Sequence, residues 1–440
     1  MLKHLLFIHG YSVRDFKSYG NFPKLLAEQL KIAESEVYIS AFDSLNNQID
    51  CDDLARSLEG RVSRLIAAGL DISKTAVLCH STGSIIARRW MLNRVIAQKP
   101  CPSHYVSLAG ANHGSTLAKL GQTQLIQLRK EVLEGSTIGL GVLSDLDYGS
   151  DFLLNLNLEW LTNFAKLKVF CFSVIGDVYD ANAPLLPDHT PVFWQIKEKG
   201  SDSTVRISGS NLNFKFVRSD QNDLAPRFQI DEQQNTAHLI LHGYSHTGQT
   251  GILERAEDAG DEALKQVIAA LSVTTQTEYD QLRTSWKGIN DQWCANAANQ
   301  ALLSSTVIFN IKSPGRFPID DYVVAILDSA GSARTVSKSM RDHQPMQNST
   351  QRGSISFFVD YGEFLKGSPH SLNITVQSSF GEMQYQSIDF DIPPDLAQLV
   401  QPNQTTYIQL ILEELNFHIL KSNSQHYPAY AKWPPLPPEN

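Results

Sequence analysis

Short apolar runs alternate with longer amphipathic segments through the first 272 residues of the chain. The apolar runs predict strands, and the segments between them, in which apolar residues recur at helical spacing, predict helices. Strands and helices that alternate in this way predict a parallel sheet covered by helices. The strands are expected at 5–9, 36–41, 75–79, 104–108, 168–175 and 238–242, and two of the helices at 53–68 and 85–98.

One long segment, residues 116–166, interrupts this alternation. It is rich in leucine, helical in period and broken by glycines near its middle. Such a segment is typical of a lid-like insertion over a binding cleft, and it is equally typical of ordinary helices packed against the sheet. The sequence leaves both interpretations open.

The pattern changes after residue 272. Residues 273–300 are polar and helical in period, which indicates a connector. Beyond them, short alternating runs separated by Gly, Pro, Asn and Ser predict an all-β domain over 301–420, sandwich-like in its number of strands. The remaining residues, 421–440, are rich in proline and aromatic residues and indicate an extended tail. We therefore expect an α/β domain over 1–272 followed by an all-β domain.

Composition and charge narrow the classes of function. Apolar residues make up 42% of the 440 and charged residues 19%, as in a folded globular protein. The formal net charge is -9 and no block of Lys and Arg occurs, which argues against a nucleic-acid partner, because phosphate binding needs clustered basic side chains. The five cysteines are odd in number, widely spaced and never arranged as C-x-x-C. Neither a disulfide framework nor a zinc site is therefore expected.

The N-terminal stretch MLKHLLFIHG contains a short apolar run like that of a secretory signal. The run breaks after four residues, whereas the apolar region of a signal spans about 7–15 residues. No window reaches the roughly 20 apolar residues of a membrane span. We expect neither a signal peptide nor a transmembrane helix, and we expect any membrane contact to be peripheral.

The stretch TAVLCHSTGS, residues 75–84, contains the first candidate for catalysis. An apolar strand leads into Ser81 and Thr82, and a helical pattern begins after Gly83. A serine at a sharp strand-to-helix turn exposes its hydroxyl from a strained backbone, and small residues two positions to either side let the helix pass close to the strand. Cys79 and Gly83 meet this requirement. Because the helix N-terminus behind Ser81 also presents amides to a developing negative charge, Ser81 is the predicted nucleophile.

The N-terminal strand supplies a candidate for the oxyanion hole. It ends in His9-Gly10-Tyr11-Ser12, the form in which α/β-hydrolases place their other oxyanion donor. The backbone amides of Tyr11 and Thr82 are therefore the predicted pair of donors.

A histidine is expected late in the chain, because the triad residues of α/β-hydrolases follow the chain order serine, acid, histidine. The stretch LILHGYSHTGQT offers His242 and His246. His242 lies in the strand run, where a buried structural histidine is the simpler interpretation, whereas His246 follows in a Gly/Ser loop from which an imidazole can reach the serine. His246 is therefore the predicted base. His113, in VSLAGANHGSTLA, is expected to stabilise a loop and not to act in catalysis.

Two carboxylates qualify as the acid between the serine and the histidine. Asp177 directly terminates the strand run KVFCFSVIG, which favours it on strand order. Asp202 lies in GSDSTVRISGSNLNF, where the local pattern is similar to the acid loop of many lipases. Asp180 and Asp188 are interpreted as solvated loop residues. Strand order and local pattern thus leave Asp177 and Asp202 open.

Five stretches together resemble one family. FIHGYSV, CHSTGS, LAGANHGSTLAKLG, GSDSTVRI and GYSHTG are similar to segments of the PlaB-type bacterial phospholipase A/lysophospholipase family, whose nucleophile motif has the form Thr-His-Ser-Thr-Gly. The likeness is densest over residues 4–250. Cys79 stands where the family has threonine, and Ser84 replaces a glycine after the motif.

This resemblance implies an α/β-hydrolase fold and a triad of Ser81, Asp202 and His246, and so favours Asp202 over Asp177. It implies the release of fatty acids from glycerophospholipids and lysophospholipids through an acyl-enzyme, without a cofactor or a metal ion. It also implies a bacterial protein that associates peripherally with membranes and is otherwise cytoplasmic. A homo-oligomer, and more specifically a homotetramer, is expected from the family.

Two other functions remain compatible with the same residues. One is a neutral-lipid or thioester hydrolase, because the triad would serve any acyl ester. The other is a catalytically silent hydrolase fold whose β domain mediates binding or assembly.

Overall fold

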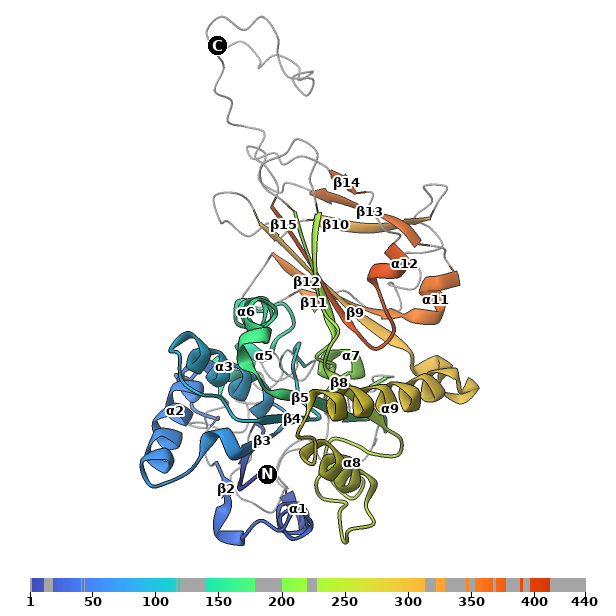
Figure 1. Cartoon of the computed structure of the whole chain (residues 1–440). Helices are drawn as coiled ribbons and strands as arrows, with labels where there is room; N and C mark the ends of the chain where they lie inside the picture. The colour runs from blue at the N-terminus through green and yellow to red at the C-terminus, as the bar shows by residue number, and fades with distance from the viewer. Residues whose placement is uncertain are drawn as a thin grey trace, which may run out of the picture.

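The computed structural model of the chain describes residues 2–11, 19–40, 42, 44–115, 118, 139–178, 200–219, 228–312, 322–328, 346–347, 353–366, 369–376, 388–390 and 396–411. Its strands form two six-stranded sheets and one three-stranded sheet. Figure 1 shows the parallel sheet in the lower half of the molecule and the other two sheets above it.

The first sheet is parallel throughout. All six strands predicted for it are present, and helices α2 (Cys51–Ala67) and α3 (Gly83–Ile96) confirm the two helices named from the sequence. The strand order is β2-β1-β3-β4-β5-β8. In that order the bounds are Val37–Ile39, His4–Ile8, Thr75–His80, His104–Leu108, Phe170–Gly176 and Ala237–Leu241.

Helices cover both faces of this sheet, which explains why its strands are apolar on both sides. In β1, Leu6 and Ile8 belong to the core shared with α2, α3 and α6 (Asp151–Leu167), whereas Leu5 and Phe7 face the opposite core. The helices on that opposite side are α1 (Phe22–Leu30), α8 (Glu262–Leu271) and α9 (Gln276–Ala295). None of the described helices combines the length and the apolar character that crossing a bilayer requires.

Helix α9 covers the β8 edge of the parallel sheet. The Asn290 side chain accepts a hydrogen bond from the Ile240 amide (2.9 Å) and donates one to the His238 carbonyl (2.8 Å). The Tyr279 hydroxyl accepts from the Ala237 amide (3.1 Å). The side chains of α9 therefore take the place of a neighbouring strand along β8, and the polar helix predicted over 273–300 is part of the first sheet's architecture.

The described part of the 116–166 segment packs as core structure. Its helices are α5 (Leu140–Leu146) and α6. Leu153, Leu156 and Trp160 of α6 are fully buried in the core that α3 also lines. Residues 116–117 and 119–138 lie outside the described residues, so a lid-like role for this segment stays a prediction.

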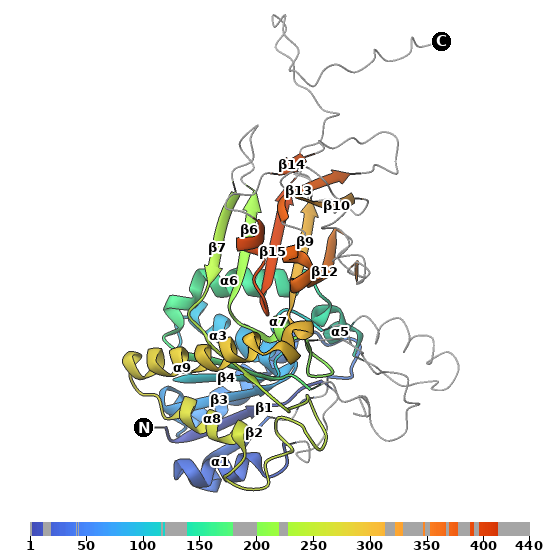
Figure 2. The same cartoon turned by 90° about the vertical axis from the view of Figure 1, so that its right-hand side faces the viewer.

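The second six-stranded sheet is mixed and draws on both halves of the chain. Its order is β11-β12-β9-β15-β6-β7, and β15 pairs in parallel with both β9 and β6. Strands β6 and β7 precede residue 272, so the chain leaves the first sheet after β5, forms this hairpin and returns as β8. Figure 2 shows green β6 and β7 beside orange and red β9 and β15. In the sheet order from β11 to β7, the strands span Met346–Gln347, Ser354–Asp360, Ser304–Lys312, Thr405–Ile411, Phe214–Ser219 and Phe228–Gln233.

The third sheet completes the β-rich part with the antiparallel order β10-β13-β14. Its strands confirm three of the short runs expected after residue 300, and β9, β12 and β15 confirm the others. Domain boundaries at 272, 300 and 420 stay predictions, and the tail over 421–440 lies outside the described residues. The strands are Tyr322–Asp328, Pro369–Val376 and Ile388–Phe390, and the short helices of this region are α7 (Ile207–Ser210), α11 (Tyr361–Lys366) and α12 (Leu396–Leu399).

The edge contacts of Asn290 can be tested by substitution. Asn290→Ala leaves a backbone amide and a carbonyl of β8 without their side-chain partner, and we expect the free energy of unfolding to fall by about 1–2 kcal/mol. Thr284→Ala removes an exposed hydroxyl bonded within the same helix, and should change it by less than about 0.5 kcal/mol. Urea denaturation measures both, and equal effects would contradict a special role for the β8 edge.

Candidate active site

Ser81 occupies a strained turn between β3 and α3. Its φ angle is 54°, in the left-handed region that a serine rarely adopts. Its amide donates to the Leu108 carbonyl (3.1 Å), and its carbonyl accepts from the amides of Ser84 (3.1 Å) and Ala111 (3.3 Å). The strand, sharp turn and helix expected from the sequence are present, and β4 with its following loop holds the turn in place.

Gly83 lets α3 pass directly against the end of β1. A Cβ atom at this position would lie 2.4 Å from the Ile8 carbonyl oxygen and 2.5 Å from that of His9. Cys79, on the other side of the serine, is fully buried against the core. The requirement for small residues around Ser81 therefore has a direct steric cause, which is the backbone of the neighbouring strand.

Asp202 and His246 form a buried pair. The His246 Nδ1–H donates to Asp202 Oδ2 (2.8 Å), and the His246 amide donates to the Asp202 carbonyl (2.8 Å). The other carboxylate oxygen, Oδ1, accepts from the amides of Thr204 (3.0 Å) and Val205 (2.8 Å). Because an ionised carboxylate only accepts hydrogen bonds, the proton of a neutral His246 ring lies on Nδ1, and Nε2 remains an acceptor.

His80 connects this pair to the serine. It precedes Ser81 in the chain, and its ring lies 4.7 Å from the His246 ring, centroid to centroid. Its Nε2–H donates to the His246 carbonyl (3.2 Å). Burial, followed by the proximity of His246, lowers the pKa of His80 well below its ordinary value, so this ring is neutral. Nothing in the sequence indicated this contact, although His80 stands beside Ser81 in the motif.

The end of β1 lies beside the serine. A Cβ atom on Gly10 would stand 2.8 Å from the Cβ of Ser81. The neutral His9 ring, whose pKa burial lowers, accepts from the Phe42 amide at Nε2 (3.1 Å) and donates from Nδ1 to the Gly10 carbonyl (2.7 Å). A trans peptide is planar, so fixing the Gly10 carbonyl also fixes the direction of the Tyr11 amide. The structure thus brings the Gly10–Tyr11 peptide next to Ser81.

The second oxyanion candidate, Thr82, is the N-cap residue of α3. The first amides of a helix have no partner within the helix, which makes this position suitable for a negative charge. The donor roles of Tyr11 and Thr82 stay predictions.

The alternative acid, Asp177, binds other groups. Its Oδ2 accepts from His242 Nδ1 (2.8 Å) and Trp293 Nε1 (2.7 Å), and its Oδ1 accepts from the Gly243 amide (2.8 Å). The expectation that His242 is buried in the strand is wrong, since it follows β8 directly and its side chain is 80% exposed. Asp177 therefore fastens the loop after β8 to α9, and Asp202 is the carboxylate at His246.

The remaining candidates are structural or lie outside the described residues. His113 is fully buried with hydrogen bonds at both ring nitrogens, in agreement with the expected loop role. Asp180 and Asp188 lie outside the described residues. All five cysteines are free thiols, and in the part of the chain that is described no three His, Cys, Asp or Glu side chains converge as metal ligands.

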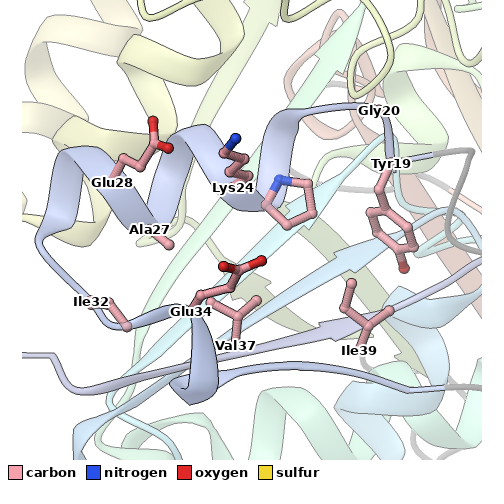
Figure 3. A pocket seen from close by; sticks show the side chains of 10 residues that line it. Tyr19, Gly20, Lys24, Ala27, Glu28, Ile32, Glu34, Val37 and Ile39 are labelled. Carbon is pink, nitrogen blue, oxygen red and sulfur yellow. The ribbon is translucent and has the colours of Figure 1, made fainter.

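A cavity of about 400 Å³ lies between α1 and the edge strand β2, away from these residues. Figure 3 shows its side chains, with the charged groups of Lys24, Glu28 and Glu34 around apolar ones. Neither Ser81 nor His246 lines it. The apolar residues of the lining are Tyr19, Pro23, Ala27, Ile32, Val37 and Ile39.

Comparison with solved structures identifies the architecture. Phospholipase PlaB from Legionella pneumophila aligns with a TM-score of 0.80 and 23% sequence identity, over 97% of each chain. This chain has the PlaB fold. A second structure of PlaB, in complex with thio-NAD, aligns with a TM-score of 0.79, again at 23% identity over 97% of each chain. No protein-family model and no curated protein sequence matches the chain.

The comparison confirms the structural resemblance inferred from the motifs and the expected fold class. A parallel six-stranded α/β-hydrolase sheet is followed by a mixed second sheet, as in PlaB. The match extends over the β-rich half as well as over the first sheet.

Substitution of Gly83 tests the steric basis of the turn. Gly83→Ala places a methyl group against the carbonyl oxygens of Ile8 and His9, and we expect a loss of about 1–3 kcal/mol in the free energy of unfolding. Gly60→Ala serves as control, because a Cβ atom at this position in α2 meets nothing within 4 Å. Thermal and urea denaturation should show a loss for Gly83→Ala alone. Equal stability of the two variants would contradict the close approach.

Proposed function

We propose that the protein is a serine hydrolase that releases fatty acids from glycerophospholipids and lysophospholipids. The observation that carries the proposal is the buried Asp202–His246 pair, held by His80 at the strained turn of Ser81. A serine in such a turn, a histidine with a free Nε2 and a carboxylate on Nδ1 are the three parts of an acyl-transfer site.

In the proposed reaction the Ser81 hydroxyl attacks the acyl carbonyl, and Nε2 of His246 accepts the hydroxyl proton. Asp202 holds the ring in the tautomer that leaves Nε2 free, and stabilises the imidazolium that forms. The amides of Tyr11 and Thr82 bind the carbonyl oxygen as it becomes negative. His246 then gives its proton to the leaving alcohol, and water attacks the acyl-enzyme with His246 again as the base, which releases the fatty acid.

The substrate class is supported by the sequence motifs and by the PlaB fold, since the solved protein with that fold is described as a phospholipase. We extend three further properties of the family to this chain as parts of the proposal. They are peripheral association with a membrane, an otherwise cytoplasmic location and assembly into a homotetramer.

Ser81→Ala tests the nucleophile and the substrate class together. Wild-type protein should hydrolyse phospholipid and lysophospholipid in preference to triglyceride, acyl thioester and short nitrophenyl esters. Ser81→Ala should lower these rates by about 10³-fold or more at unchanged melting temperature. Ser63→Ala, on the exposed side of α2, is the matched control and should retain wild-type rates.

The outcomes separate the rival functions. A strong preference for triglyceride or thioester would contradict the substrate class while leaving the nucleophile intact. Hydrolysis that persists in Ser81→Ala would contradict the assignment of Ser81. No hydrolysis of any ester by the wild type would favour a catalytically silent protein.

Replacing Asp202 and Asp177 separately with asparagine tests which carboxylate serves as the acid of the triad. Asp202→Asn places an amide at Nδ1 of His246, favours the wrong tautomer and should reduce kcat by about 10³- to 10⁴-fold. Asp177→Asn should cost about 1–3 kcal/mol in the free energy of unfolding, because three donors, among them the buried Trp293 Nε1–H, lose a carboxylate acceptor, and it should change kcat little. Steady-state kinetics and urea denaturation of both variants check this. A larger loss of kcat in Asp177→Asn would contradict the assignment.

A further inference from the structure

Tyr407 brings one hydroxyl from the second sheet into the interior of the first. It lies on β15, is fully buried, and its ring stacks on Phe216 with centroids 5.1 Å apart. Its hydroxyl lies 2.9 Å from His113 Nδ1 and 2.8 Å from Asn157 Nδ2. These two partners belong to the loop after β4 and to α6, so a single oxygen joins the second sheet to two elements around the first.

The direction of each hydrogen bond follows from the partners. His113 Nε2 lies 2.8 Å from the Asn211 carbonyl, which can only accept, so the ring proton is on Nε2. Burial lowers the pKa of His113 to about 3, so the ring is neutral and Nδ1 is an acceptor. The Tyr407 hydroxyl therefore donates to His113 Nδ1 and accepts from Asn157. Every polar atom of the His113 ring is used.

Asn157 is fixed from its other side by a buried cation. Its Oδ1 accepts from the Arg88 guanidinium (2.9 Å), which lies over the Trp160 ring at 4.6 Å from the centroid. Arg88 also donates to the Asn112 carbonyl (3.2 Å), and burial lowers its pKa to about 10, which leaves it charged at neutral pH. A buried charge makes its hydrogen-bond partners costly to displace, so the position of Asn157 is well defined.

The loop that contains His113 also supports the serine. Residues 109–113 follow β4 and run past the turn, where the Ala111 amide donates to the Ser81 carbonyl (3.3 Å). Ala109 has a φ angle of 49°, so the loop is strained at its start and needs contacts to hold it. At its end, the His113 amide donates to the Gly209 carbonyl (2.9 Å).

A second connection runs through Asn112. Its side-chain amide donates to the Ser107 hydroxyl (3.1 Å), which donates to the Ser84 hydroxyl (3.0 Å) in the first turn of α3. The Ser84 amide in turn donates to the Ser81 carbonyl. Ser84, which replaces a glycine of the family pattern, therefore joins the turn to the same loop. Both routes from residues 109–113 end on the serine's own carbonyl.

We propose that Tyr407 is a positioning residue for the nucleophile, whose hydroxyl fixes His113 and thereby the loop 109–113 that holds the Ser81 carbonyl. The proposal rests on the proposed role of Ser81 as nucleophile. It goes beyond that role by making the second sheet part of the catalytic frame, although Tyr407 touches neither the substrate nor the reacting atoms. A small change at β15 should then appear in the reactivity of a serine on the other sheet.

Tyr407→Phe removes the hydroxyl and keeps the ring packed on Phe216. His113 Nδ1 loses its donor, and the loop gains freedom to shift. We expect kcat for a nitrophenyl ester, and the rate constant for inactivation by a small fluorophosphonate, each to fall about threefold to tenfold, which corresponds to the loss of one hydrogen bond. KM should stay unchanged, because the substrate contacts are not altered.

Tyr279→Phe is the matched control. Its hydroxyl is also buried and donates to the Cys171 carbonyl (2.6 Å), but it lies on α9 at the β8 edge, and its hydrogen bonds go to Cys171, Asn235 and Ala237 instead of the loop 109–113. We expect Tyr279→Phe to lower the melting temperature at least as much as Tyr407→Phe does, with kcat and the inactivation rate unchanged. A general loss of stability would affect the two variants alike.

A double-mutant cycle tests the route of the effect. If Tyr407 acts through His113, Tyr407→Phe should have no further effect on the inactivation rate in a His113→Ala background. Multiplicative losses in the double variant would overturn the proposal. So would a change confined to KM, a wild-type inactivation rate in Tyr407→Phe, or the same loss in Tyr279→Phe. If the wild type neither hydrolyses esters nor reacts with the fluorophosphonate, the proposed function itself fails, and this inference with it.

Discussion

The close approach of α3 to the backbone of β1 at Gly83 is the constraint on which the site depends. The carbonyl oxygens of Ile8 and His9 occupy the space that a side chain would need. With the helix start pressed against this strand, the chain between β3 and α3 turns through a left-handed residue, which is Ser81. Gly10 also lies against the serine, so the Ser81 turn and the Gly10–Tyr11 peptide are packed together at this end of β1.

Asp202 and His246 are held in a different way, by hydrogen bonds between loops from distant parts of the chain. The carbonyl and the carboxylate of Asp202 accept from the amide and the ring of His246, and Oδ1 accepts from the amides of Thr204 and Val205 in its own loop. It leads into α7, where the Ser208 hydroxyl bonds to Thr306 of β9 (2.7 Å) and the Ser208 carbonyl accepts from Thr405 of β15 (2.9 Å). The second sheet therefore supports the loop that contains Asp202, through the hydrogen bonds of α7 to β9 and β15.

Local patterns predicted the elements well because each depends on a few neighbouring residues. The strands of the first sheet are short apolar runs buried on both faces, and the serine turn is marked by small residues at fixed offsets. The choice between Asp177 and Asp202 could not be made in this way, because strand order favours Asp177, local pattern favours Asp202, and the histidine that decides between them lies on another loop. His242 was placed wrongly because its apolar neighbours suggested that the strand continued, whereas β8 ends one residue earlier and the His242 side chain is exposed.

What the sequence could not reveal is the membership of β6 and β7 in the second sheet. Their apolar pattern fits any sheet, and the partner strands lie far along the chain. Polar residues such as Asn157 and Asn211, which bond to Tyr407 and Asn403, have no local signature either. From the sequence alone a buried asparagine cannot be told from an exposed one. Long-range hydrogen bonding is therefore the part of this fold that a single sequence expresses least.

Strand β15 lies between β6 and β9, and its register pairs Tyr407 with Phe216. The central strand of the second sheet is therefore one of the last to be synthesised. Its pairing with β6 closes a loop of many residues, which is entropically slow. Until β15 arrives, β6 and β9 each present an unpaired edge to whatever other chain is near. A nascent chain of this fold should therefore depend on chaperones for much of its synthesis, and truncation before β15 should yield aggregates instead of a smaller folded protein.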